Sequence, residues 1–170
     1  MALRRTLAAL LTGGALVFAT PALGAPAADL ARDPALWATV NICDTVGHPD
    51  GVGLRGSMPG SDDRRDALFM RLRLQFQRGD GTWQAVGPAG DSGWMALGRG
   101  DARVRQAGRT FTVMPPPDGH PAYVMRGVAA FEWRRNGDVV RRARRATSAG
   151  HPGTPGADPA GFSDATCSVR

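Results

Sequence analysis

Residues 68–78, LFMRLRLQFQR, decide the fold, because apolar and polar side chains alternate along them. Every second residue from Leu68 to Phe76 is apolar, and from residue 71 onward the positions between them hold arginine or glutamine. Successive side chains of a β-strand point to opposite faces, so residues two apart share a face. The stretch therefore predicts a β-strand with one face on a core and the other in water.

The rest of the chain repeats this pattern of short strand-forming runs separated by turn residues, with no amphipathic helical pattern. Asn136-Gly137 is the strongest signal of a two-residue hairpin. About seven to nine strands of this kind predict an all-β fold, a single antiparallel β-sandwich of the immunoglobulin-like type over residues 36–170. A small closed barrel is the alternative. The predicted strands are 36–45, 52–57, 68–78, 82–86, 94–97, 109–114, 122–135, 139–147 and 166–169.

The N-terminal residues are typical of a signal peptide. Arg4 and Arg5 precede an apolar stretch, and small residues follow it at 22 and 24, the two positions that a signal peptidase would read. We expect residues 1–24 to be removed and residues 25–35 to form a flexible segment leading into the domain. The mature protein is then secreted or associated with the cell envelope, with no membrane span after signal removal. The export route, general secretory or twin-arginine, stays open.

The chain has two cysteines, Cys43 and Cys167. In an oxidising compartment they predict one disulfide that closes a very long loop. The alternative is a pair of free buried thiols.

The formal net charge is +6, and every basic residue counted in it is arginine, since the sequence contains no lysine. That usage fits a GC-rich genome, and removal of Arg4 and Arg5 leaves a modestly basic domain.

Six arginines gather in the predicted hairpin around Asn136-Gly137. A two-residue turn would pair Arg135 with Asp138 and place Glu132 opposite Arg141. In the same register Phe131 faces Arg142 and Trp133 faces Val140, unless a bulge shifts the strands. The hairpin is a candidate patch for an anionic partner, and a charged edge that resists aggregation is the alternative. Its candidate residues are Arg134, Arg135, Arg141, Arg142, Arg144 and Arg145.

The tetrapeptide Gly90-Asp91-Ser92-Gly93 matches the sequence around the nucleophile of trypsin-like serine proteases. Such an enzyme needs a histidine base, an orienting aspartate and two barrels, which this chain is too short to form. Trp94 also stands where the motif has another glycine. We therefore interpret the tetrapeptide as a loop between strands and expect no catalytic residue.

Other short motifs are weaker. Arg-Gly-Asp occurs at 78–80 and 99–101, each time in a predicted turn. Acidic residues cluster at 44–50 and 62–66 without the spacing of a zinc or EF-hand site. No metal and no cofactor is expected.

The chain resembles small exported proteins of high-GC actinobacteria, a group with no assigned activity. The resemblance lies in the signal peptide and in VNICDT (40–45), LRGSMPG (54–60), YVMRGVAAFEWRRNGDVVRRA (123–143) and ADPAGFSDATC (157–167). The long strand and hairpin are also similar to the last two strands of bacterial immunoglobulin-like domains. We expect a non-enzymatic binding or interaction module, whose partner is an anionic extracellular or cell-wall polymer or another secreted protein. A secreted hydrolase, or a hydrolase inhibitor acting through loop residues, is the alternative.

Overall fold

A computed structural model describes Leu30 and residues 32–170, so the predicted signal peptide lies outside the described residues. The described residues form nine strands, in the order that the sequence predicts, and one short 3-10 helix, η1 (Pro88–Gly90). The strands are β1 (Trp37–Thr45), β2 (His48–Pro59), β3 (Asp66–Gln77), β4 (Trp83–Ala85), β5 (Met95–Arg99), β6 (Val104–Thr112), β7 (Tyr123–Arg135), β8 (Asp138–Ala146) and β9 (Cys167–Val169).

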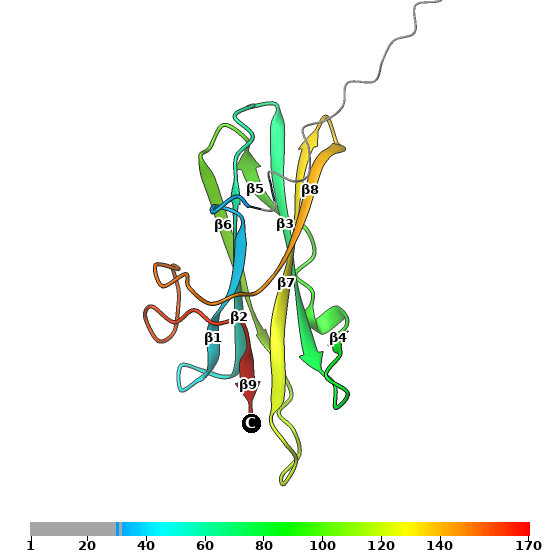
Figure 1. The fold of residues 1–170 in the computed structure, drawn as a ribbon, viewed down its shortest axis with the longest axis vertical. Coiled ribbons are helices and arrows are strands. Elements are labelled where there is room, and N and C mark those ends of the chain that lie inside the picture. Colours follow the sequence, from blue (N-terminus) through cyan, green and yellow to red (C-terminus); the bar gives the residue numbers. More distant parts are fainter. Residues whose placement is uncertain (1–29, 31) are drawn as a thin grey trace, which may run out of the picture.

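The strands form two antiparallel sheets that pack together as a sandwich (Figure 1). One sheet has the order β1-β2-β6, and the other has the order β4-β3-β7-β8. In the second sheet β5 also pairs with β3, and β9 also pairs with β7, which gives six strands in all. The prediction of an all-β fold with packed antiparallel sheets is confirmed.

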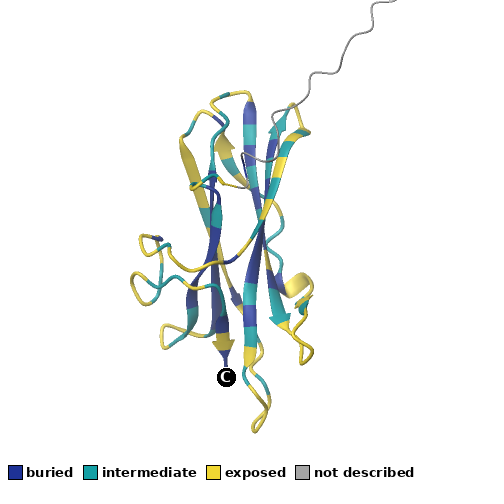
Figure 2. Cartoon of the chain, viewed as in Figure 1, coloured by how far each residue is buried: buried dark blue, intermediate teal, exposed yellow. Residues whose placement is uncertain are grey.

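The core lies between the two sheets, where Figure 2 shows buried segments facing one another. The alternation in β3 is the predicted one, since Leu68, Met70, Leu72 and Leu74 are at most 1% exposed. Buried large side chains of the six-stranded sheet meet those of β1 and β2. The indole Nε1–H of buried Trp133 donates a hydrogen bond of 3.1 Å to the carbonyl oxygen of Pro59. This bond satisfies the one polar group of the ring.

Glycines allow the two sheets to approach closely, and Gly127 is one of them. A Cβ atom at Gly127 in β7 would lie 2.7 Å from both Cδ atoms of Leu54 in β2 and 2.8 Å from Cγ2 of Thr147. Real Cβ atoms essentially never come that close to other atoms. Leu54 therefore fills the space that any larger residue at 127 would need.

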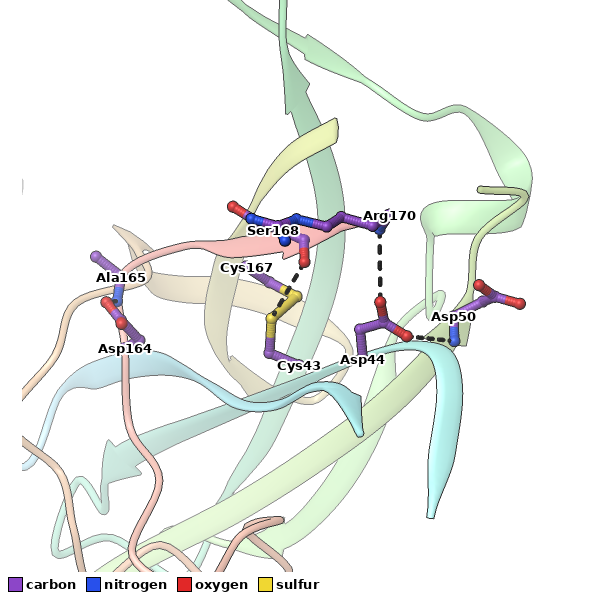
Figure 3. Close-up of a disulfide and its surroundings, with 8 residues drawn as sticks. All are labelled: Cys43, Asp44, Asp50, Asp164, Ala165, Cys167, Ser168 and Arg170. Atoms are coloured by element: carbon purple, nitrogen blue, oxygen red, sulfur yellow. Dashed lines mark hydrogen bonds between the residues drawn. A yellow bond between two sulfur atoms is a disulfide. The ribbon is translucent and has the colours of Figure 1, made fainter. Parts of the chain in front are cut away.

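A disulfide joins Cys43 in β1 to Cys167 in β9, with their Cα atoms 5.3 Å apart (Figure 3). This bond confirms the predicted pairing, and it links one sheet covalently to the other. Beside it, the Asp44 carboxylate accepts a hydrogen bond of 2.8 Å from the backbone N–H of Asp50.

The hairpin between β7 and β8 corrects part of the predicted register. Asn136 and Gly137 form the turn with φ of 53° and 95°, and Arg135 pairs with Asp138 as predicted. Beyond this turn a bulge at Val140 shifts the strands. The predicted pairing of Glu132 with Arg141 is therefore wrong, because Glu132 lies opposite Arg142.

The bulge has a packing reason. Without it, Arg142 would face Phe131 and point at the core. With it, Ala143 faces Phe131 and packs against the core, while Val140 is left 53% exposed. Arg141, and not Val140, lies opposite Trp133.

Candidate functional site

The predicted loop Gly90-Asp91-Ser92-Gly93 runs along the edge of β3, between β4 and β5. The backbone N–H of Ser92 donates to the carbonyl oxygen of Leu72 at 2.9 Å, and the Ser92 hydroxyl accepts from the Leu72 N–H at 2.8 Å. The hydroxyl donates in turn to the carbonyl oxygen of Gly93 at 2.8 Å. The Ser92 oxygen thus takes the place of a backbone carbonyl in the edge ladder. The absence of enzymatic activity stays a prediction.

Asp91 anchors the same loop through two arginines of β3. Its carboxylate accepts from Nε of Arg71 at 2.8 Å, from Nη2 of Arg71 at 2.5 Å and from Nε of Arg73 at 3.1 Å. Mainly the Arg71 hydrogen bonds lower the pKa of Asp91 from its ordinary 3.8 to about 2. The carboxylate therefore stays ionised at any pH well above about 2.

Arg71 and Arg73 belong to a larger basic surface on the outer face of the six-stranded sheet. Because β3, β7 and β8 pair in register, their outward side chains fall into rows across the sheet. One row is Arg71, Ala130 and Arg144, and the adjacent row is Phe69, Glu132 and Arg142. We call this surface the arginine face. It contains Arg71, Arg73, Arg126, Arg134, Arg142 and Arg144, with Asp91 and Glu132 as its carboxylates.

Aromatic rings hold two of these arginines in place. The guanidinium of Arg126 lies 4.2 Å from the centroid of the Trp83 ring, and its Nε donates to Gln75 at 2.9 Å. The guanidinium of Arg134 lies 4.2 Å from the Phe69 ring and 5.0 Å from the ring of Trp94, which is 37% exposed. Such stacking fixes the cation without neutralising it.

The positive charges of the arginine face also act on one another. Burial, and next the charge of Arg144, lower the pKa of Arg126 below its ordinary value. Repulsion between Arg126 and Arg144 is the smaller of these two causes, and an anion bound between the two guanidinium groups would relieve it.

The six predicted patch arginines are divided between three surroundings. Arg134, Arg142 and Arg144 lie on the arginine face. On the opposite side of β8, Arg141 lies 5.0 Å from the Trp133 ring, and Arg145 donates to the Leu30 carbonyl oxygen at 2.5 Å.

Arg135, the remaining patch residue, binds two carboxylates at the end of the sheet. Its Nε donates to buried Asp66 at 2.8 Å and its Nη2 donates to Asp63 at 2.7 Å. Burial acts to raise the pKa of Asp66, but the hydrogen bonds from Arg135 and Ser61 outweigh it and lower that pKa overall. Arg135 is therefore a structural residue of the acidic cluster at 62–66.

Sequence reasoning missed Arg71, Arg73 and Arg126 as members of a common surface. Each alternates with core residues along its own strand, which indicates an outward side chain. Only the pairing of β3 with β7, which are about fifty residues apart in sequence, brings them together.

The acidic and histidine clusters bind protein groups. At 44–50, His48 Nδ1 lies 3.0 Å from the Asp158 carboxylate. Within the part of the chain that the structure describes, no group of three or more His, Cys, Asp or Glu side chains could hold a metal ion. Among these same residues, no helix is long and apolar enough to cross a membrane.

An apolar groove of about 530 Å³ lies where β3 ends and β7 begins. Phe76, Val113, Met114, Tyr123 and Met125 are among its lining residues. Its lining contains no charged side chain, which separates it in chemistry from the arginine face.

Comparisons with known proteins give no family. No family model and no curated protein matches the chain. Among solved structures, the chain is similar to Pseudomonas fluorescens alkylpurine DNA glycosylase AlkC bound to DNA containing an abasic site analog, at 14% identity and a TM-score of 0.29. The match covers 65% of this chain and 28% of that chain. A TM-score of this size does not establish a common fold.

Proposed function

We propose that the protein is a non-enzymatic extracellular interaction module that binds an anionic polymer, of the kind found in cell walls, through the arginine face. The observation that carries the proposal is the gathering of six arginines, with two carboxylates, on one face of the sheet. Neighbouring rows of this face are about 7 Å apart, the spacing of alternate residues in a strand. A flat array of regularly spaced cations complements a chain of repeated negative charges.

Two exposed arginines of this array lie on β8. Arg142 and Arg144 are exposed and make no side-chain ion pair with another described residue. Since they are two residues apart on one face, both can contact the same extended polymer. Arg126 and Arg134 are held by aromatic rings, so less side-chain entropy is lost when they bind an anion.

Secretion and an immunoglobulin-like sandwich are part of the same proposal. Support for secretion comes from the signal-like residues 1–24 and from the disulfide, which is a feature of proteins in oxidising compartments. Support for the immunoglobulin-like type comes from the two packed antiparallel sheets with a buried tryptophan between them. The proposed kinship with exported actinobacterial proteins rests on the sequence motifs alone.

The test is the binding of mature protein, residues 25–170, to long-chain inorganic polyphosphate, followed by fluorescence anisotropy at several salt concentrations. We expect binding at about 50 mM salt that weakens steeply as salt rises. The double variant Arg142→Gln/Arg144→Gln should weaken binding about tenfold or more. Its slope of log affinity against log salt concentration should be shallower, by the amount expected for about two fewer phosphate contacts.

The matched control is Arg109→Gln, which removes an exposed arginine from β6 of the other sheet. It should change the affinity less than about twofold. Absence of polyphosphate binding at about 20 mM salt, or equal losses in control and double variant, would refute the proposal.

A further inference from the structure

A small hollow continues the arginine face at the start of β3. In register across the sheet, Arg99 of β5, Ala67 of β3 and Arg134 of β7 form one row. Because the methyl group of Ala67 is short, the two long side chains beside it stand around a pocket of about 230 Å³. Arg65, from the loop before β3, also lines the pocket. Three arginines from three segments therefore surround one space.

The donors of these arginines are only partly used. Arg65 binds Asp63 through Nε and Nη2, and Arg134 binds Glu132 through the same two atoms. Their Nη1 groups make no hydrogen bond with any residue that the structure describes, and the same holds for the whole guanidinium of Arg99. Neither Asp63 nor Glu132 lines the pocket.

Ion pairs fix the direction of two of the three guanidinium groups, those of Arg65 and Arg134. Arg134 is held from one side by Glu132 and lies over the Phe69 ring, which lines the pocket as well. Asn136 and Gly137, the two residues of the hairpin turn, complete the lining, so an amide side chain stands next to the guanidinium groups. The guanidinium groups of Arg65 and Arg134 are thus held beside this space before any ligand binds, while that of Arg99 is free.

We propose that this pocket binds a terminal phosphate monoester, namely the end group of the anionic polymer that lies along the arginine face. The inference rests on the proposed function. A phosphate monoester has three terminal oxygens and a charge of about −1.5 to −2, which match three guanidinium groups. A carboxylate has two oxygens and a single charge, and would neutralise three guanidinium groups less completely.

The geometry also favours a chain end over the middle of a chain. A hollow of about 230 Å³ encloses one phosphate with a few attached atoms, whereas a continuous polymer needs an open track. From the pocket row, the next two outward rows contain Arg142 and Arg144 of β8. A polymer that begins in the pocket would therefore run past these two arginines at about 7 Å per row.

The experiment compares two synthetic glycerol-phosphate oligomers of equal length, one ending in a phosphate monoester and one in a hydroxyl group, by calorimetry. Wild-type protein should bind the phosphate-terminated oligomer about tenfold more tightly. Ala67→Leu fills the floor of the pocket and keeps every charge, and Arg99→Gln removes the arginine whose whole guanidinium group is free. In both variants the ratio of the two affinities, phosphate-terminated to hydroxyl-terminated, should fall to about one. The affinity for the hydroxyl-terminated oligomer should change less than about twofold.

Two further variants separate the pocket from the face. Arg142→Gln/Arg144→Gln should weaken both oligomers alike and preserve the preference, and Arg109→Gln should leave both affinities unchanged. Equal affinity of wild-type protein for the two oligomers, or a preference that survives in both pocket variants, would overturn the pocket assignment and leave the proposed function standing.

The monoester glycerol 1-phosphate tests the pocket without the face. If wild-type protein binds this probe, Arg99→Gln does not, and the longer oligomers bind no more tightly than the probe, the pocket is supported and the proposed function is refuted. If neither the monoester nor the oligomers bind, both proposals fail.

Discussion

Replacement of Asp91 by asparagine removes a negative charge from the arginine face and keeps the shape of the side chain. The pKa of Asp91 is about 2 in the folded protein, against an ordinary 3.8. Since both Asp91 and its main partner Arg71 are largely shielded, at 18% and 29% exposure, this difference corresponds to about 2 kcal/mol of folding free energy. Asp91→Asn should destabilise the protein by that amount at neutral pH.

The sign of the pH dependence follows from the direction of the change. Folding lowers the pKa, so the ionised carboxylate stabilises the native state. Its contribution is complete above about pH 4 and is lost as the pH falls to about 2. Urea unfolding of wild type and variant should therefore differ by about 2 kcal/mol at pH 7 and by little at pH 2.

Asp118→Asn is the matched control, because Asp118 is exposed in the loop before β7 and makes no ion pair with a described residue. It should leave the free energy of unfolding unchanged. The reasoning would be refuted if Asp91→Asn lowers the free energy of unfolding by less than about 0.5 kcal/mol at pH 7, or if it lowers this free energy equally at pH 7 and pH 2.

The affinity for polyphosphate should increase in Asp91→Asn, although the stability decreases. Without the Asp91 charge, Arg71 and Arg73 become available to a polymer, so the variant should bind polyphosphate a few-fold more tightly at pH 7 although it is less stable. Weaker binding by a folded Asp91→Asn protein would show that Asp91 positions the two arginines for the partner and does not compete with it.

Two predictions concern the fold itself. Cys43→Ala/Cys167→Ala opens a loop with a sequence separation of 124 residues. Loop entropy predicts that the free energy of unfolding falls by about 4 to 5 kcal/mol, measured by urea unfolding against the oxidised parent. A fall below about 1 kcal/mol would contradict this prediction. Gly127→Ala forces a methyl group against Leu54 and should lower the free energy of unfolding by about 1 to 3 kcal/mol. Gly79→Ala, which places its methyl group in open space, should leave it unchanged. Equal effects of the two changes would show that the sheets can move apart.

The sequence was enough to locate all nine strands, because alternation in β3 and the turn residues between strands are local signals. Strand ends were less predictable. β2 begins at His48 and not at residue 52, since His48 pairs across a tight turn with Thr45 at the end of β1. That pairing depends on β1 and leaves no pattern in residues 48–51.

The candidate site was harder to predict than the fold. The Asn136-Gly137 turn correctly gave the pairing of Arg135 with Asp138, but the bulge at Val140 moved every later pair by one residue. The bulge follows from burying Ala143 in place of an arginine, a requirement set by the core and not by the hairpin. Because one residue of shift reverses which side chains face outward, the arginine face depends on this tertiary contact.

The disulfide also determines how the protein would respond to tension. A force applied outside Cys43 and Cys167 passes from β1 through the sulfur–sulfur bond to β9, so it does not stretch residues 44–166. Strands β3, β7 and β8, which make up the arginine face, lie entirely within that covalent loop. As long as the disulfide is oxidised, the surface proposed to bind a polymer is shielded from pulling at the ends of the chain.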